Sequence, residues 1–282
     1  FCYLDPFKGA QIAFVECMRN LACSGARALA VTDNLNFANP NKPEAYYMLK
    51  ECVKGLAEAC SFFDVPVVGG NVSLYNEHGQ GGIDPTPVVS MVGLIDKAEQ
   101  VTRSFFGGPE ESVILLGGLP HELGGSYFLQ TQFSKKEGKV PEIDLTAEKK
   151  LQDFLLTRIT DGGVKAAHDL SEGGLLVALV EMLFDKPHLG ISVSLDSRGA
   201  SGRLDGLLFG ESQGRVLISV SPENEDGTLQ AAKQAGVSAQ LIGQTDSSGL
   251  VKVVVEGDEI LDSEVSLLRE TWDQAIPRSM GV

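Results

Sequence analysis

The sequence predicts an α+β fold of mixed α/β sheets, divided into two domains at residues 1–106 and 107–282. A chain of 282 residues is long enough to bury two hydrophobic cores. Short apolar runs of strand length alternate with amphipathic runs of helix length along the whole chain. A stretch at 107–110, which reads GGPE, separates two such series and is typical of a domain boundary.

A strand–helix–strand crossover organises the first predicted domain. Apolar residues at 28–31 and 65–68 predict two buried strands, and the apolar spacing within 43–63 predicts the helix between them. Such a connection places the two strands parallel and close together. A helix at 7–24 and a further strand at 85–95 complete a mixed sheet with helices on one face.

Each crossover strand runs into a polar segment, TDNLNFANP after the first and GGNVSLYNE after the second. If both segments are loops at the carboxyl ends of neighbouring strands, they lie at the edge where open α/β sheets bind ligands. Gly69 and Gly70 would let a phosphate approach the backbone. The segments also supply oxygen ligands of the kind that Mg²⁺ accepts beside phosphate: Asp33, Asn34, Asn36, Asn71, Ser73 and Asn76. The alternative, that these are ordinary turn residues, stays open.

Strands and helices alternate in the second predicted domain as well. Apolar runs predict strands at 113–116, 164–170, 190–195, 216–220, 239–243 and 250–255. Helical spacing predicts helices at 146–160, from 171 onward, at 226–235 and around Trp272 near the end of the chain. Thr146 and Ser171 are the expected N-caps of the first two of these helices.

Three polar motifs in this second part have two interpretations each. His168-Asp169 suggests acid–base chemistry, but a polar pair at a strand end before a helix favours capping. The glycine-rich run ending in Gly124-Gly125-Ser126 could cradle a phosphate, yet it lacks a Walker lysine. The GESQG motif at 210–214 has one cation beside it, Arg215.

Composition excludes several classes of function. The formal net charge of −15 argues against a nucleic-acid-binding face, which would have to be basic. No apolar run reaches membrane-spanning length, and no secretory leader is visible, so we expect a cytoplasmic protein. Five cysteines without paired spacing fit small core residues in a reducing compartment. The opening FCYL, without an initiator Met, suggests a piece of a longer chain.

The motifs TDNLNFANP, GGNVSLYNE and HDLSEGGL resemble phosphoribosylformylglycinamidine synthase, a family within the aminoimidazole ribonucleotide synthetase-like superfamily. They resemble the second of the two homologous halves of its synthetase subunit. The resemblance implies an ATP-dependent carbon–nitrogen ligase of purine biosynthesis. That enzyme converts formylglycinamide ribonucleotide, ATP and glutamine-derived ammonia into formylglycinamidine ribonucleotide, ADP and phosphate.

The resemblance also implies roles for four residues where the motifs match. Asp33 and Gly70 correspond to ATP contacts, Asn71 to a magnesium ligand and Ser73 to a substrate contact, with ATP and Mg²⁺ as cofactors. The catalytic histidine of the family lies in the first half, which is absent here. We therefore assign no catalytic residue to this chain and expect it to be inactive alone.

The implied partners are the missing N-terminal half, together with a glutaminase subunit and a small accessory subunit, or a fused glutaminase domain. Alone, the chain is expected to form a homodimer that pairs its first domains. In this resemblance, GESQG is the pseudo-symmetric copy of a substrate motif and could form an auxiliary phosphate site. Two alternatives remain: another superfamily member, such as an ATP-dependent cyclo-ligase or kinase, and a non-catalytic nucleotide-binding scaffold.

Overall fold

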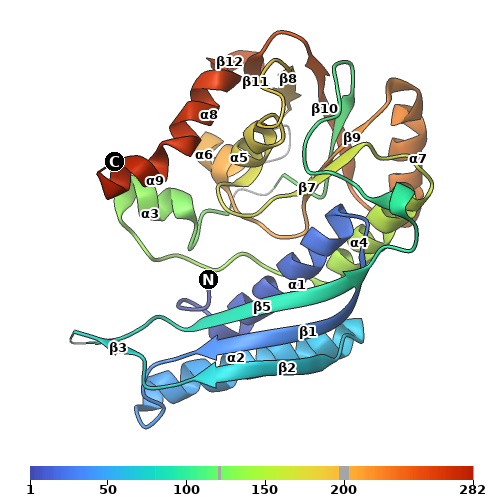
Figure 1. The fold of residues 1–282 in the computed structure, drawn as a ribbon. Helices are drawn as coiled ribbons and strands as arrows, with labels where there is room; N and C mark the ends of the chain where they lie inside the picture. The colour runs from blue at the N-terminus through green and yellow to red at the C-terminus, as the bar shows by residue number, and fades with distance from the viewer. Residues whose placement is uncertain (80, 120–121, 197–202, 282) are drawn as a thin grey trace.

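The computed structural model describes residues 1–79, 81–119, 122–196 and 203–281, and these form two packed units (Figure 1). The first contains a three-stranded sheet and the second a seven-stranded sheet. We call them the three-stranded unit and the seven-stranded unit. A two-stranded hairpin, β3 (Glu77–His78) and β4 (Gly81–Gly82), extends from the first. The predicted mixed α/β fold is therefore confirmed.

The three-stranded sheet has the order β2-β1-β5, with β1 (Arg27–Asn36) in the middle. It pairs in parallel with β2 (Val67–Ser73) and antiparallel with β5 (Thr86–Leu94). Helices α1 (Pro6–Cys23) and α2 (Pro43–Phe63) pack on one face, behind the sheet in Figure 1. The predicted crossover and the one-sided helical layer are thus confirmed.

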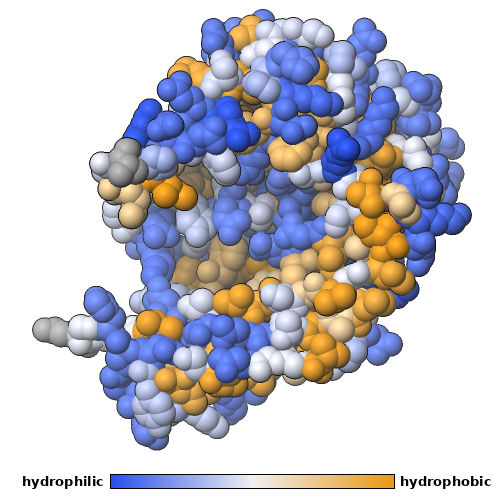
Figure 2. All heavy atoms as spheres, in the orientation of Figure 1, coloured by the Kyte–Doolittle hydropathy of each residue, from blue (hydrophilic) through white to orange (hydrophobic). Residues whose placement is uncertain are grey.

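The other face of this sheet is open. Alternate residues of β5 on that face are exposed, among them Val88, Val92 and Leu94, and apolar residues gather over the sheet in Figure 2. β2 was expected to be buried, but it is an edge strand, and Val67 and Val68 are exposed. The expectation was wrong because apolar composition alone cannot show whether a second layer covers a strand.

The seven-stranded sheet has the order β12-β11-β8-β10-β6-β9-β7. All neighbours pair antiparallel except β8 and β11, which are parallel. The strands are β6 (Ser112–Leu116), β7 (Ala166–Asp169), β8 (Gly190–Leu195), β9 (Val216–Val220), β10 (Ala239–Asp246), β11 (Leu250–Val255) and β12 (Asp258–Glu264). The helices are α3 (Tyr127–Phe133), α4 (Leu145–Thr160), α5 (Gly174–Glu181), α6 (Leu204–Phe209), α7 (Glu225–Ala235), α8 (Val265–Asp273) and α9 (Ala275–Met280), with single 3₁₀ turns at Ala98–Gln100 and Pro222–Asn224.

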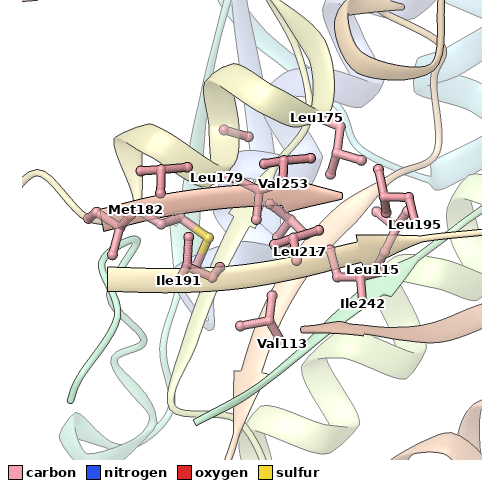
Figure 3. Close-up of a cluster of buried hydrophobic side chains, with 14 of the residues drawn as sticks. Val113, Leu115, Leu175, Leu179, Met182, Ile191, Leu195, Leu217, Ile242 and Val253 are labelled. Atoms are coloured by element: carbon pink, nitrogen blue, oxygen red, sulfur yellow. The ribbon is translucent and has the colours of Figure 1, made fainter. Parts of the chain in front are cut away.

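Two cores lie on opposite faces of this sheet. Helices α5, α6 and α8 cover one face over a cluster that includes Leu115, Leu179 and Ile191 (Figure 3). Helices α4 and α7 cover the other face at β6, β9 and β7, and the end of α1 joins them there. Because both faces of β6 are covered, all five of its residues are buried.

Two helices begin elsewhere than predicted. The N-cap of α4 is Asp144 rather than Thr146, because the Asp144 carboxylate accepts the backbone N–H groups of Thr146 and Ala147. Helix α5 begins at Gly174, after Gly173 in a left-handed conformation, so Ser171 is not its N-cap. Helices α3 and α6, strand β12 and the hairpin were not predicted from the sequence. No helix in the described ranges has the length and apolar character needed to cross a membrane.

Leu115 provides a test of the first core. Leu115→Ala should lower the free energy of unfolding by about 3 kcal/mol, because it removes a fully buried side chain from β6 and leaves a cavity. Leu241→Ala, at a partly exposed position on neighbouring β10, is the matched control and should cost well under half as much. Urea unfolding of both variants measures the difference, and equal costs would contradict this packing.

Candidate functional site

The four residues singled out from the sequence lie on two adjacent strands. In the parallel ladder of β1 and β2, Asp33 is opposite Gly70, Asn34 is opposite Asn71, and Asn36 is opposite Ser73. These segments were predicted as loops, but they continue the strands. The ladder extends because β1 pairs on its other side with β5 through the same residues, so its polar segment keeps backbone partners on both sides.

The sheet separates these residues between its two faces. Side chains alternate along a strand, and Val31 and Leu35 are buried against the helices, so Asp33 projects to that side. A Cβ added to Gly70 would lie 2.7 Å from the Asp33 carbonyl oxygen and from Oδ1, so a glycine is needed beneath this carboxylate. Asp33 therefore lies on the opposite face of the sheet from Asn71, although the two segments were expected to supply ligands at one edge.

Asn34 and Asn71 form a pair on the open face. Asn71 Nδ2 donates to Asn34 Oδ1 at 3.2 Å, and both side chains are exposed. This bond orients the two amides and leaves the Asn71 amide oxygen available. An amide oxygen on an open face is a ligand that Mg²⁺ accepts beside water and phosphate.

Two of the other predicted oxygen donors brace the backbone. Asn76 Nδ2 donates to the carbonyl oxygens of Ser73 at 2.9 Å and Phe37 at 3.2 Å, which ties the ends of β1 and β2 together. Ser73 Oγ lies 3.2 Å from Asn76 Oδ1 and donates to it. Asn36 Nδ2 donates to the Asn34 and Thr86 carbonyl oxygens. These contacts shape the strand ends rather than present a set of ligands.

The electrostatics of this region depend on one acid. Burial raises the pKa of the Asp33 carboxyl above its usual value. Burial, and then the nearby Asp33, raises the pKa of the Cys60 thiol on α2. Within the described residues, no three His, Cys, Asp or Glu side chains gather so as to hold a metal ion. A magnesium ion here would therefore depend on amide, phosphate and water oxygens.

A second polar region lies in the cleft between the two units. Small-molecule sites commonly have volumes of about 300–1,000 Å³. The volume of this cleft is ≈ 460 Å³. Figure 2 shows the surface hollowed there. The first four residues and 84–87 line one side, and Tyr127, Glu172 and Glu211 line the other. Strand β5 begins at Thr86, so the cleft adjoins the end of the sheet that carries Asn36 and Ser73.

Carboxylates from both units face this cleft. Burial, followed by the negative charges of Glu172 and Asp169, raises the pKa of Glu16 from 4.5 to about 7. Burial also raises the pKa of Asp169, whose Oδ2 atom has no hydrogen-bond partner among the described residues. The expected capping role of Asp169 is therefore not observed.

Arg215 does not present its charge to the cleft. Its side chain is fully buried, and it donates to the carbonyl oxygens of Ser212 and Gly210, which curls the motif around the guanidinium. Burial, and then the charge of Arg19, lowers the pKa of Arg215 to about 10. Sequence reasoning also missed Glu16 and Arg19. Both could have been noticed in the sequence, because each is a charged residue among the apolar residues of the first predicted helix.

Comparison with known proteins assigns the family. The profile for AIR synthase related protein, N-terminal domain, matches residues 1–95, and that for AIR synthase related protein, C-terminal domain, matches residues 108–256. The chain belongs to the AIR synthase related family. The resemblance deduced from the motifs is thus confirmed. The first profile covers all strands of the three-stranded sheet, and the second covers the seven-stranded sheet except β12.

Curated relatives extend this family assignment over nearly the whole chain. "Phosphoribosylformylglycinamidine synthase subunit PurL" of Caldanaerobacter subterraneus is 43% identical over 272 residues, which are 96% of this chain and 36% of the relative. The protein of the same name from Moorella thermoacetica is 43% identical over 281 residues, 100% of this chain and 38% of the relative. The chain therefore spans a little over a third of the length of these relatives.

Solved structures show the same fold. Thermotoga maritima PurL complexed with ATP superposes with a TM-score of 0.74 at 23% identity, covering 94% of this chain and 42% of that one. The complex of the same protein with FGAR gives 0.76 at 22% identity, with coverage of 95% and 44%. Escherichia coli HypE, a hydrogenase maturation protein, gives 0.68 at 18% identity, with coverage of 91% and 79%. The AIR synthase related fold of two domains is therefore shown, whereas the boundary at 106/107 stays a prediction.

Glu16 makes the stability of the protein depend on pH. Its native pKa is raised from 4.5 to about 7, so between these values the native state holds a proton that the unfolded chain has lost. Unfolding then releases a proton, and this group makes stability fall as the pH rises from about 4.5 to 7. Urea unfolding between pH 5 and 8 should show that Glu16→Gln removes this part of the fall.

Glu259→Gln, at an exposed position on β12, is the matched control and should leave the pH dependence unchanged. If Glu16→Gln and wild type lost stability in parallel across this range, the pKa of Glu16 would not be raised in the native state.

Proposed function

We propose that this chain forms the second half of the synthetase of phosphoribosylformylglycinamidine synthase. That enzyme is an ATP-dependent ligase that makes formylglycinamidine ribonucleotide from formylglycinamide ribonucleotide, ATP and glutamine-derived ammonia. The observation that carries the proposal is the register of β1 and β2, which sets the TDNLNF and GGNVS motifs side by side. Identity of 43% to PurL subunits over nearly the whole chain supports it.

In this proposal ATP phosphorylates the amide oxygen of the substrate, and ammonia then displaces the phosphate. Such chemistry relies on positioning the groups and neutralising their charge. Asn71 would hold Mg²⁺ through its amide oxygen, in the orientation set by Asn34, and the ion would neutralise the phosphates. Ser73 would contact the substrate at the end of β2.

Asp33 and Gly70 would contact ATP on the helix side of the sheet. A carboxylate only accepts hydrogen bonds, so Asp33 suits a hydroxyl or amino group of the nucleotide and not a phosphate oxygen. Partial burial raises the pKa of Asp33, because desolvation disfavours its charged form. Gly70 keeps the backbone beside it open.

The open face of the three-stranded sheet fits the missing half of the enzyme. An apolar surface next to Asn34 and Asn71 is exposed at Val88, Val92 and Leu94. A partner that buried this surface would also cover the two asparagines. The chain alone should cover this face with a second copy, giving a homodimer. The complete enzyme would take ammonia from a glutaminase subunit with a small accessory subunit, or from a fused glutaminase domain, in the cytoplasm.

A second candidate is a non-catalytic nucleotide-binding scaffold. It is favoured by the absence, within the part of the chain that the structure describes, of three His, Cys, Asp or Glu side chains that could together hold a metal ion. An ATP-dependent cyclo-ligase or kinase of the same superfamily is a weaker alternative. Bound nucleotide that survives purification, together with no turnover in the presence of the absent half, would favour the scaffold.

Co-expression with the absent half tests the proposed site. Asn71→Ala should reduce ammonia-dependent turnover by about 10- to 100-fold, with part of the loss recovered at higher Mg²⁺, because a metal contact is removed. Asp33→Ala should raise KM for ATP. Asn20→Ala, at the exposed end of α1, is the matched control and should behave as wild type.

The chain alone should show no turnover. Full activity of the purified chain, or an Asn71→Ala variant as active as the Asn20→Ala control, would refute this assignment.

The oligomeric state tests the open face. Light scattering at micromolar concentration should give a dimer for the wild-type chain and a monomer for Val92→Glu, since a buried unpaired charge opposes association. Val53→Glu, on the exposed side of α2, is the control and should remain dimeric. A monomeric wild type would contradict pairing through this sheet.

A further inference from the structure

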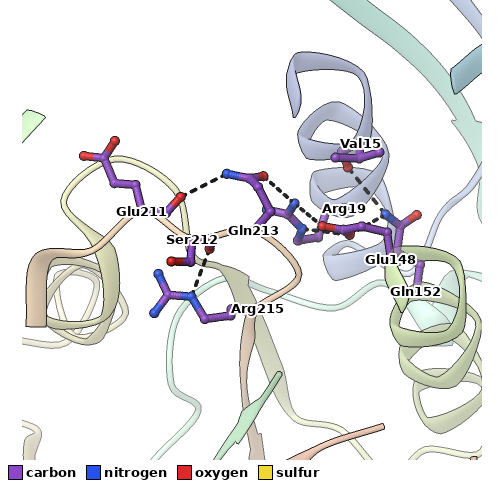
Figure 4. Close-up of polar contacts among 8 residues, drawn as sticks. All are labelled: Val15, Arg19, Glu148, Gln152, Glu211, Ser212, Gln213 and Arg215. Atoms are coloured by element: carbon purple, nitrogen blue, oxygen red, sulfur yellow. Dashed lines mark hydrogen bonds and ion pairs between the residues drawn. The ribbon is translucent and has the colours of Figure 1, made fainter. Parts of the chain in front are cut away.

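The 211–215 loop, which carries the sequence ESQGR, connects three parts of the molecule. It lies in the seven-stranded unit immediately before β9, it contacts Arg19 on α1 of the three-stranded unit, and through Arg19 it is linked to Glu148 on α4 of its own unit (Figure 4). Through Glu211 it also reaches the beginnings of α3 and α5. These contacts give the motif a role that does not depend on the proposed reaction.

Glu211 joins two helix beginnings with one carboxylate oxygen. Its Oε1 accepts the backbone N–H of Tyr127 at 2.8 Å and that of Gly173 at 3.1 Å. Tyr127 is the first residue of α3, and Gly173 is the N-cap of α5. Glu211 is buried, and a buried carboxylate that accepts two N–H groups holds both firmly.

Gln213 connects the backbone of Glu211 to the other unit. Its Nε2 donates to the Glu211 carbonyl oxygen at 3.1 Å, and its Oε1 accepts Arg19 Nη2 at 2.9 Å. The Gln213 amide therefore forms hydrogen bonds through both its nitrogen and its oxygen, so its orientation depends on Arg19 as well as on the 211–215 loop.

Arg19 is held in turn by Glu148 on α4. Arg19 Nη2 lies 2.7 Å from Glu148 Oε1, and Arg19 Nε lies 3.3 Å from Glu148 Oε2, a two-point contact between α1 and α4. Both side chains are buried. Burial opposes the charge on Arg19, but Glu148, with smaller contributions from Asp169 and Glu16, raises its pKa. Gln152 completes the network by donating to Glu148 Oε2 and the Val15 carbonyl oxygen.

The ends of this chain of contacts form a wall of the cleft. Tyr127, Glu172, Glu211 and Gln213 all line the cavity between the units. Arg19 approaches this wall from the three-stranded unit, whose strand β5 forms part of the opposite side. A shift of Arg19 would therefore move the wall through Gln213 and Glu211, and not only alter the packing of α1 on α4.

We propose that Arg19 is a positioning residue that couples the two units, setting the cleft wall at the beginnings of α3 and α5 through Gln213 and Glu211. The ion pair with Glu148 keeps Arg19 in place, and Gln213 transmits that position to the loop. A purely structural ion pair would stabilise the whole protein without a particular effect on these two helix beginnings.

Two methionine substitutions separate these roles. Gln213→Met and Gln152→Met each remove one amide from the same buried network at similar side-chain volume, but only Gln213 leads to the 211–215 loop. Amide hydrogen exchange is followed at Tyr127 and Gly173, with Leu115 in β6 as a reference for global opening. Urea unfolding measures the global stability of each variant.

Gln213→Met should speed exchange at Tyr127 and Gly173 about tenfold more than at Leu115, the size expected for loosening a hydrogen bond to a charged group. Gln152→Met should change all three amides in proportion to its effect on global stability. Equal effects of the two variants on Tyr127 and Gly173, or no selective effect of Gln213→Met, would overturn the proposal.

Arg19→Lys is the second variant and decides the matter if Gln213→Met does not fold. A lysine keeps the charge beside Glu148 but cannot present the planar fork that contacts Glu148 and Gln213 together. It should reproduce the selective loosening at Tyr127 and Gly173. Exchange that stays proportional to global stability in Arg19→Lys would show that the pair only stabilises the fold.

Discussion

A buried ion pair, Arg19 with Glu148, joins the two units of this protein. Both charges are removed from water, so each depends on the other, and removing either side chain would leave the other charge buried without its ion-pair partner. The pair therefore constrains how α1 can lie on α4. That constraint extends to the 211–215 loop and to the carboxylate-lined cleft, because Gln213 and Glu211 continue the chain of contacts.

The three-stranded sheet is complete as a backbone structure but open as a surface. Its central strand has partners on both sides, while the face that carries Asn34 and Asn71 has no second layer within the described residues. An apolar face of this kind beside a polar pair is suited to a partner surface. The chain spans little more than a third of the length of the PurL subunits that it matches.

Sequence periodicity predicted the bounds of helices and strands well where the apolar residues lie on one face of the element or where the element is buried on both faces. The helix expected at 43–63 and the strands expected at 190–195, 216–220 and 250–255 have the predicted bounds. Polar segments were predicted less well. Residues 32–36 and 70–73 have the composition of turns, yet they continue strands because a neighbouring ladder satisfies their backbone groups. The start of α5 was misplaced for a related reason, since Glu211, distant in sequence, holds the N–H of Gly173.

By itself the sequence determined the mixed α/β class, the crossover that makes β1 and β2 neighbours, and the motifs of the family, because apolar periodicity and local motifs are properties of short segments. Only the tertiary structure decided that Asp33 and Asn71 project to opposite faces, that Arg215 curls its own loop, and that Arg19 meets Glu148. The face of a residue depends on strand register, and a buried charge depends on a partner far away in the chain. Neither is encoded in the few residues around the position concerned.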